Sequence, residues 1–472
     1  MKILMVCTPF PPYNNIGGVR TGKMAKYLHR AGHDLRVITL RNQPKPVALH
    51  LEIPLECVTY APWFSLDAAF RPTAGRGLGG LARGLTRGLR PLEDAVASYA
   101  ANPIDRPGPT TGSPGPSAGS HARPAAAGGP RKRRGLRRHL GALASFPDPL
   151  VGWYPFACRA ALRISGDWRP DVIYASSPGP TGLLVAHAVA ARLGVPWVAE
   201  FRDLWMDHPA QDWPGWRQRL GERLERTTLS TAEALVAVSE PAADLLRRKF
   251  GRDTFVVTNG FDPADFPARP VVPFRDGSLR IVHTGELFAG GRTPALLFAA
   301  LCGREDLTRR IRVAFYGSPE TLALAGSLAR AHGVAAVVEL IPSIPYRESL
   351  RVQSEADVLL LPLWDDPKVR GWHSGKFFEY IGARRPILAT GPATDVDAEV
   401  IRARRLGVVL DDPAQVARLL EEWVRVKARE GFLPSPPAEA AAGFTREELA
   451  GKLESVLLAV AGPPAGARSG RS

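Results

Sequence analysis

The sequence has few cysteines, and their spacing does not suit a metal site or a disulfide framework. Its 472 residues include four, at Cys7, Cys57, Cys158 and Cys302, with no CxxC pair and no cysteine–histidine cluster. A disulfide-rich secreted scaffold or a structural zinc site would need such clusters. Scattered free thiols fit a reducing compartment, so we expect a cytoplasmic protein.

Long apolar runs are also missing. A membrane-spanning helix needs about 20 mostly apolar residues, and no stretch of the chain approaches this length. The first residues, MKILMVCTPF, are too short for the apolar region of a signal peptide and have no small-residue cleavage site. They predict a first buried strand, and the chain is not expected to cross a membrane.

Acidic residues are in the minority, because 61 Lys and Arg face 46 Asp and Glu, for a net charge of +15. The excess is concentrated in residues 71–140, where thirteen basic and three acidic residues leave a surplus of ten. This segment belongs to a Gly-, Pro- and Arg-rich insertion, 71–147, which we expect to be partly disordered. Two interpretations stay open: residues 75–140 dock on anionic lipid at the inner face of the plasma membrane, or they are a solvated insertion. Binding to nucleic acid is not expected, since no aromatic residues alternate with the charges.

Outside the insertion, short apolar strands alternate with amphipathic helices, which predicts parallel sheets covered on both faces. We predict an α/β protein of two doubly wound, Rossmann-like domains that face a cleft. The predicted segments are a first domain (1–262), a Pro- and Asp-rich linker (263–277), a second domain (278–428), and a C-terminal helix that packs towards the first domain, followed by a disordered tail (429–472). In such sheets, ligands bind at the carboxyl ends of the strands.

The first domain contains two candidate ligand sites. The stretch GGVRTGKM (17–24) nearly matches a phosphate-binding P-loop, but it ends in Met24, which cannot bind Mg²⁺. We interpret Gly17, Gly18 and Arg20 as a glycine-rich loop near a ligand; the alternative is a simple turn. The stretch VAEFRDLW places Arg202 and Asp203 after a buried strand, either at a ligand or in a local salt bridge.

The second domain has the stronger signals. In HTGELFAGGRTP, Thr284 and Gly285 follow its first strand, and Arg292 stands where the next helix is expected to begin, either as part of an anion site or in solvent. The stretch GWHSGKFFEY predicts a helix start that holds an anion. Its donors would be the amides of Ser374, Gly375, Lys376 and Phe377, and the lysine would add charge. Ser374 can cap this helix, whereas Glu379 lies too far along for a capping box and needs another role.

Taken together, these features resemble the GT-B glycosyltransferases, specifically the retaining group called glycosyltransferase family four. The resemblance rests on YNNIGGVRTGKMAKYLHRAGHDLRVIT, DVIYASSPGPTG, EFRDLW, VVTNGFD and KFFEYIGARRPI in this order. It implies transfer of a sugar, with retention, from a nucleotide-sugar donor on the second domain to a glycan or lipid-linked acceptor on the first. It also implies that Glu379 binds the donor's ribose and that the helix start binds the diphosphate.

Several positions depart from the family pattern. Gly371 stands where the first acid of the Glu-x7-Glu motif is expected, Glu286 lies near the place of an arginine, and Arg202 replaces a histidine that many members carry. Only Arg292 can replace the usual lysine of the donor loop. We expect Lys376, Arg292 and Glu379 to form the catalytic centre, without a metal or other cofactor. A sugar-nucleotide epimerase of the same fold remains the alternative, because a fold does not fix a reaction.

Overall fold

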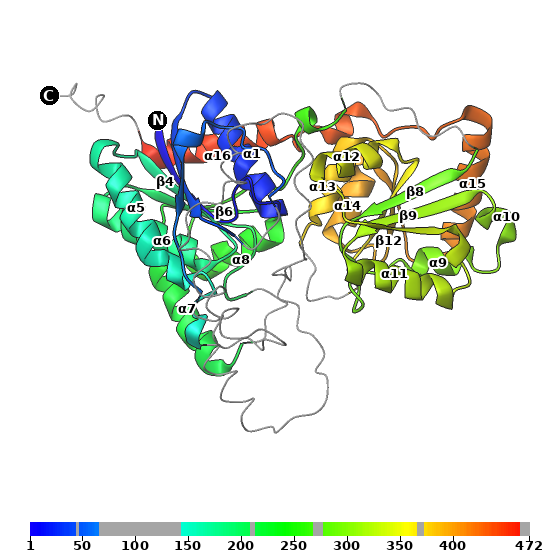
Figure 1. The fold of residues 1–472 in the computed structure, drawn as a ribbon, viewed down its shortest axis with the longest axis horizontal. Helices are drawn as coiled ribbons and strands as arrows, with labels where there is room; N and C mark the ends of the chain where they lie inside the picture. The colour runs from blue at the N-terminus through cyan, green and yellow to red at the C-terminus, as the bar shows by residue number, and fades with distance from the viewer. Residues whose placement is uncertain (44–46, 66–142, 208–212, 268–276, 366–371, 463–472) are drawn as a thin grey trace. The chain divides into compact units, whose positions relative to one another are not determined.

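Figure 1 shows the computed structural model, which describes residues 1–43, 47–65, 143–207, 213–267, 277–365 and 372–462. Most of the predicted insertion at 71–147, and Gly371, lie outside the described residues. The chain divides into two compact units, the first formed by residues 1–257 and 450–472 and the second by residues 258–449. The division thus falls just before the predicted linker, and the chain returns to the first unit within its last helix.

The first unit is built on a seven-stranded, fully parallel sheet with the strand order β3-β2-β1-β4-β5-β6-β7. The strands are β1 (Lys2–Cys7), β2 (Asp34–Leu40), β3 (Val58–Ala61), β4 (Val172–Ser177), β5 (Trp197–Phe201), β6 (Ala234–Ala237) and β7 (Thr254–Val256). The helices are α1 (Ile16–Arg30), α5 (Tyr154–Asp167), α6 (Pro180–Leu193), α7 (Gly215–Leu229) and α8 (Glu240–Phe250). Strand β3 and helix α5 were not predicted from the sequence.

The direction of winding in this sheet reverses between β1 and β4, which are neighbours although α1, β2, β3 and α5 lie between them in sequence. Both strands are almost entirely buried, as expected for central strands covered by helices on both faces. Helices α5, α6 and α7 lie side by side in one layer (Figure 1). In an open parallel sheet, the carboxyl edge at such a reversal is the usual place for a ligand.

The second unit repeats this plan with six parallel strands in the order β10-β9-β8-β11-β12-β13. The strands are β8 (Leu279–Thr284), β9 (Ile311–Gly317), β10 (Val338–Pro342), β11 (Val358–Pro362), β12 (Ile387–Thr390) and β13 (Gly407–Leu410). The helices are α9 (Ala295–Leu301), α10 (Glu305–Thr308), α11 (Pro319–Ala331), α12 (Tyr346–Glu355), α13 (Gly375–Ala383), α14 (Val396–Arg404) and α15 (Pro413–Glu430). Its winding reverses between β8 and β11.

Alternating side chains of the second sheet fill two separate cores. Ile281 of β8 packs with α9, α11 and α15, whereas its neighbour Val282 packs with α12, α13 and α14. Figure 1 shows α9 and α11 together in one layer. Because successive side chains in a strand point to opposite faces, this alternation fixes the register of β8 and hence the position of Thr284 at its carboxyl end.

The last helix, α16 (Arg446–Ala461), begins in the second unit, and from Ala450 onward it groups with the first. Within the first unit, Glu454 of this helix contacts His33 Nε2 at 2.8 Å. Among the described residues, no helix combines the length and the apolar character needed to cross a membrane.

Candidate active site

The second unit's site centres on the N-terminal end of α13. Ser374 is the N-cap residue, but its side chain makes no capping hydrogen bond. Its Oγ instead accepts from Arg292 Nη2 at 2.6 Å, and its N–H donates to Asp397 Oδ2 at 3.0 Å. The predicted capping role of Ser374 is therefore wrong, because the hydroxyl holds an arginine. The amides of Gly375 and Lys376, in the first turn, have no acceptor within the helix.

Lys376, in the first turn of α13, forms an ion pair with Glu379 in the next turn. Lys376 Nζ lies 2.9 Å from Glu379 Oε2, and the lysine side chain keeps 28 % of its surface exposed whereas the glutamate keeps 5 %. The pair leaves an accessible cation and a buried carboxylate beside the positive end of the helix. A helix end of this kind favours negatively charged ligands.

Gln353 of α12, which was not predicted as a site residue, connects this pair to the end of β8. Its Nε2 donates to Glu379 Oε2 at 2.8 Å and to Thr284 Oγ1 at 2.9 Å. Its Oε1 is buried and has no partner among the described residues. A glutamine in an amphipathic helix carries no sequence signal of this role, because the pattern shows only which face of the helix is buried.

Thr284 and Gly285 lie where they were predicted, at the carboxyl end of β8. Gly285 has a φ of +126°, and a Cβ at this position would lie 3.2 Å from Lys376 Cγ. The glycine therefore leaves room for the stem of the lysine. Phe377 has a different place from the predicted one: its amide donates to Ser374 O at 3.1 Å and its side chain is fully buried in the core, so it has no donor to offer a ligand.

Arg292 is buried rather than solvated, with 9 % of its surface exposed. It lies three residues before α9 begins at Ala295, so the predicted position at the helix start is corrected. Its Nε donates to Pro362 O at the end of β11, at 2.9 Å. Arg292 thus bridges β11 and α13 at the point where the sheet reverses its winding. Burial lowers the pKa of its guanidinium, and Asp397 and Asp395 oppose that shift.

Two aspartates at the start of α14 support this arrangement. Asp397 accepts from the Ser374 amide and contacts His373 Nδ1 at 2.7 Å. Burial, and then the adjacent Asp397 carboxylate, raise the pKa of Asp395 to about 6. The two carboxylates therefore stabilise the charge of Arg292, and Asp397 also holds the start of α13 through the Ser374 amide.

In the first unit, the stretch predicted to be a glycine-rich loop is helical. Gly17 and Gly18 form the first turn of α1, where the Asn15 side chain accepts from Gly17 N at 2.8 Å. Arg20 is fully buried and paired with Glu200 at 2.6 Å. The structure therefore gives Arg20 a place in the core instead of at a ligand. The last position of the P-loop-like stretch, Met24, is also fully buried.

Arg202 follows β5 and is buried against this helix start. Its Nη2 donates to Thr8 O at 2.6 Å, and its Nε donates to Ser177 O. Asp203 is half-buried and acts electrostatically on Arg202, but the local salt bridge between them, one of the two interpretations of this stretch, does not form. Thus the structure brings Arg202 together with Gly17, and it brings Lys376, Glu379, Arg292, Thr284 and Gly285 together in the second unit.

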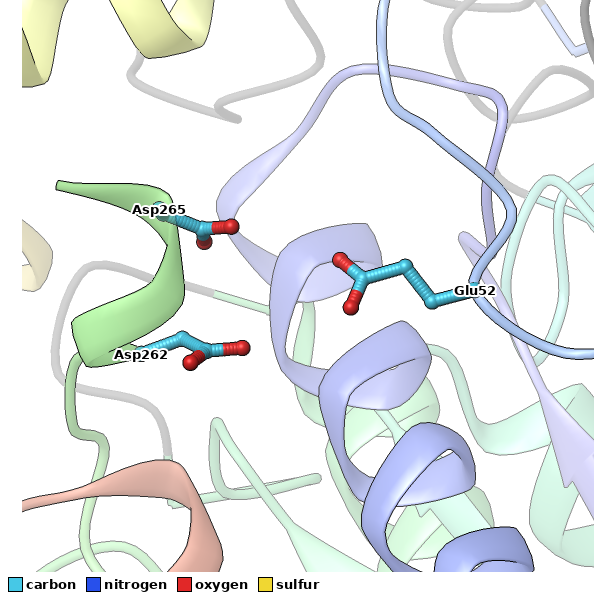
Figure 2. A group of neighbouring side chains, drawn as sticks. All are labelled: Glu52, Asp262 and Asp265. Atoms are coloured by element: carbon cyan, nitrogen blue, oxygen red, sulfur yellow. The ribbon is translucent and has the colours of Figure 1, made fainter. Parts of the chain in front are cut away.

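Three acidic side chains that are not part of this set are drawn in Figure 2. Glu52 belongs to the first unit, where it pairs with Lys26 at 2.6 Å and also with Lys23. Asp262 and Asp265 belong to the second unit, at the short helical turn η5 (Pro263–Asp265), and Asp262 caps this turn by accepting from Ala264 N. These contacts give Glu52 and Asp262 structural roles.

Two doubly wound α/β units with parallel sheets, the second with a cationic helix start at its strand ends, are the architecture of the GT-B glycosyltransferases. A family model described as a glycosyl transferase 4-like domain matches residues 17–260, more than half of the chain. The chain therefore belongs to the glycosyl transferase 4-like family, and it is a glycosyltransferase. No curated protein matches the sequence.

Solved structures share the fold at low sequence identity. A sucrose-phosphate synthase from Thermosynechococcus elongatus is similar with a TM-score of 0.58 and 13 % identity, over 96 % of this chain and 98 % of that one. Anabaena HepE in complex with UDP and glucose gives 0.57 and 13 %, over 97 % and 99 %. WaaG, a glycosyltransferase involved in lipopolysaccharide biosynthesis, gives 0.53 and 13 %, over 97 % and 99 %. These similarities confirm the predicted fold class.

Proposed function

We propose that the protein transfers a hexosyl unit from a nucleoside-diphosphate sugar, bound by the second unit, to an acceptor bound by the first. The observation that carries this proposal is the Lys376–Glu379 pair, with its atoms 2.9 Å apart at the start of α13. It provides a cation for a diphosphate and, next to it, a carboxylate for a sugar hydroxyl.

In the transfer, the bond between the anomeric carbon and the β-phosphate oxygen breaks, and the nucleoside diphosphate leaves with the electron pair. The acceptor hydroxyl forms the new bond on the same face and gives its proton to the departing phosphate, so the configuration is retained. Negative charge grows on the phosphate during this step. Fixed charges and dipoles at that position lower the barrier because they act most strongly in the transition state.

The residues of α13 and its surroundings fit this role. Lys376 brings a partly exposed ammonium, the amides of Gly375 and Lys376 bring helix-end donors, and buried Arg292 holds the hydroxyl of Ser374. Together they supply positive charge at a fixed position, and we propose that the reaction proceeds without a metal. Glu379, oriented by Gln353 and Lys376, would accept hydrogen bonds from the ribose hydroxyls.

The structural neighbours support the choice of donor and acceptor classes to test. HepE was solved with UDP and with UDP-glucose, and WaaG acts in lipopolysaccharide biosynthesis. We propose a nucleotide-sugar donor and a glycan or lipid-linked acceptor of the cell envelope. The enzyme would then work in the cytoplasm, at the inner face of the plasma membrane. A role for the basic segment 75–140 in membrane contact stays a proposal.

A thermal-shift screen of UDP-, GDP- and dTDP-sugars tests the donor assignment, followed by incubation of the stabilising donor with a panel of acceptors. We expect one nucleotide class to stabilise the protein and Glu379→Ala to abolish that shift. Conversion of the donor without any acceptor would identify an epimerase instead. No stabilisation by any donor, together with an unchanged Glu379→Ala variant, would contradict the assignment of the donor site.

A further inference from the structure

His373, the residue just before the N-cap of α13, is held by the same carboxylate that holds the cap. Its Nδ1 lies 2.7 Å from Asp397 Oδ1, and the Ser374 amide donates to Asp397 Oδ2 at 3.0 Å. The Asp397 side chain is almost fully buried. Because this carboxylate serves as an acceptor, we assign a proton to Nδ1, which leaves the lone pair of the neutral ring on Nε2.

Aromatic packing fixes the orientation of the His373 ring. The ring is nearly parallel to that of Phe377, at an interplanar angle of 13° with the centroids 6.0 Å apart, and it meets Phe378 edge-on at 5.4 Å. Nε2 makes no hydrogen bond within the part of the chain that the structure describes, and it stays accessible, since 11 % of the side chain is exposed. A purely structural link to Asp397 needs Nδ1 alone. The second nitrogen is therefore held at a fixed, accessible position without a partner.

This nitrogen belongs to the same end of α13 as the candidate diphosphate site. His373 precedes Ser374, whose hydroxyl accepts from Arg292, and Lys376 follows in the first turn of the helix. The amides of Gly375 and Lys376 have no acceptor within the helix. An anion bound at these amides has His373 next to it, and the imidazole offers that anion an N–H from Nε2 only when the ring is protonated.

Opposing charges act on a protonated His373 in the free protein. Asp397 and Asp395, at the start of α14, stabilise an imidazolium. Arg292, Lys376 and the positive end of α13 oppose it. A bound diphosphate changes this balance, because it neutralises the cations and accepts a charge-assisted hydrogen bond from Nε2. Binding of the anion thus favours the protonated ring.

We propose that His373 is a donor-binding residue that couples binding of the diphosphate to the uptake of a proton. A proton from solvent adds to Nε2, and the imidazolium donates this hydrogen to a phosphate oxygen while Nδ1–H stays on Asp397. No covalent bond of the donor forms or breaks in this step. The inference rests on the proposed function, because it takes the ligand to be a nucleoside-diphosphate sugar. It gives donor binding a pH dependence near neutrality, which lysine and arginine do not ordinarily provide.

Proton uptake is measured on the wild-type protein by calorimetric titration with UDP-, GDP- and dTDP-glucose. The phosphates of these diesters carry no proton near neutrality, so they release none on binding. Titrations at one pH, in buffers that differ in ionisation enthalpy, give the number of protons taken up. We expect about half a proton to one proton near pH 7, and an affinity that falls as the pH rises from about 6 to about 8.

The outcomes of this measurement separate the inference from the proposed function, and they need no variant that has to fold. Donor binding without proton uptake would overturn the role of His373 and leave the proposed function standing. Failure of all three nucleotide sugars to bind would overturn both.

His373→Asn distinguishes a contact with the ligand from a structural role. The asparagine amide can take the place of Nδ1 and keep the hydrogen bond to Asp397, but it has no atom at the position of Nε2. At pH 6 it should weaken donor binding at least about tenfold, as for loss of a charge-assisted hydrogen bond. It should also abolish the proton uptake and flatten the pH dependence. Wild-type affinity and uptake in this variant would reduce His373 to a structural residue.

Two further variants complete the test. His332→Asn is the matched control, since this half-buried histidine of the second unit also uses Nδ1, in a contact with Leu328 O at 2.8 Å; its uptake and affinity should equal those of the wild type. Asp395 is a neighbouring group whose protonation can change, because its pKa is raised to about 6. Asp395→Asn should keep the uptake. Uptake that persists in His373→Asn and disappears in Asp395→Asn would assign the proton to the aspartate and overturn the inference.

Discussion

Arg292 and Ser374, 82 residues apart in sequence, are joined by a hydrogen bond of 2.6 Å from Nη2 to Oγ. This bond connects the loop after β8 to the start of α13 and fixes a buried guanidinium behind the amides of Gly375 and Lys376. A planar guanidinium can reach the Pro362 carbonyl and the Ser374 hydroxyl at once, which a lysine cannot. The cationic helix start is thus positioned by a residue that a backbone carbonyl of β11 holds on one side and the hydroxyl of Ser374 holds on the other.

Arg292→Lys should therefore lower catalysis while the fold is kept. The charge remains, but one of the two contacts is lost and the start of α13 is held less firmly. We expect kcat/KM to fall about 10- to 100-fold, less than the roughly 100- to 1000-fold for removing a preorganised donor outright, because the charge is kept. Steady-state kinetics with the donor identified in the screen measure this effect. Arg309→Lys, on a side chain that is 79 % exposed, is the matched control, and an equal loss there would refute the positioning role of Arg292.

Glu379→Gln should weaken binding of the nucleoside diphosphate without the sugar. The substitution keeps the volume, but it removes the charge that pairs with Lys376 and accepts from Gln353. Loss of a charged hydrogen-bond acceptor costs about 1.5–3 kcal/mol, which predicts a Kd for UDP about 10- to 100-fold higher by calorimetry. Glu348→Gln, on the exposed face of α12, should leave the Kd unchanged. Equal UDP affinity in the Glu379→Gln variant and the wild type would show that the carboxylate does not contact the ligand.

Most of the fold was predictable because the two sheets are parallel and buried. Strands such as β1 and β11 read as continuous apolar runs, and helices alternate with them, so element order alone indicates doubly wound units. The short strand β3 and helix α5 were not predicted, since they flank the Gly-, Pro- and Arg-rich insertion. Its composition obscures the regular spacing of apolar residues that marks strands and helices. The return of α16 to the first unit from Ala450 depends on tertiary packing and has no local signal.

The candidate site was predictable where polar or charged residues mark a strand end, as at Thr284, or a helix start, as at Lys376 and Glu379. It was not predictable where burial decides the role. Arg20 follows a pair of glycines, and it pairs with Glu200 in the core. Arg202 follows the end of a strand, and it lies where the winding of the first sheet reverses. Gln353 acts through two side chains far from it in sequence. Such pairings arise from three-dimensional packing, which residue spacing does not encode.

Gly285→Ala should reduce both stability and activity. A side chain at φ +126° is strained, and the new methyl group would press on Lys376 at 3.2–3.3 Å and move its ammonium. We expect a loss of about 1–3 kcal/mol of unfolding free energy, seen as a lower Tm, and a lower kcat. Gly277→Ala separates the two effects, since Gly277 also has a positive φ of +79° but no atom lies within 4 Å of its Cβ position. That variant should lose stability alone; a normal kcat in Gly285→Ala would contradict the contact with Lys376.

Asp395→Asn should change how stability depends on pH. The pKa of Asp395 is raised to about 6 in the folded protein, first by burial and then by Asp397, against about 3.9 in an unfolded chain. A raised carboxyl pKa favours folding at low pH, and that contribution is lost as the pH rises from about 4 through 6. The asparagine variant keeps the N-cap of α14 without this loss. Relative to wild type, it should therefore gain about 1–2 kcal/mol between pH 4.5 and 7.5, because this window covers only part of the effect of a two-unit shift. Tm measured at both pH values checks this.

Asp306 provides the control, because its pKa is lowered by the hydrogen bond to Arg304. Asp306→Asn should therefore show the opposite trend of stability with pH. The same trend in both variants would rule out the raised pKa of Asp395 as the cause.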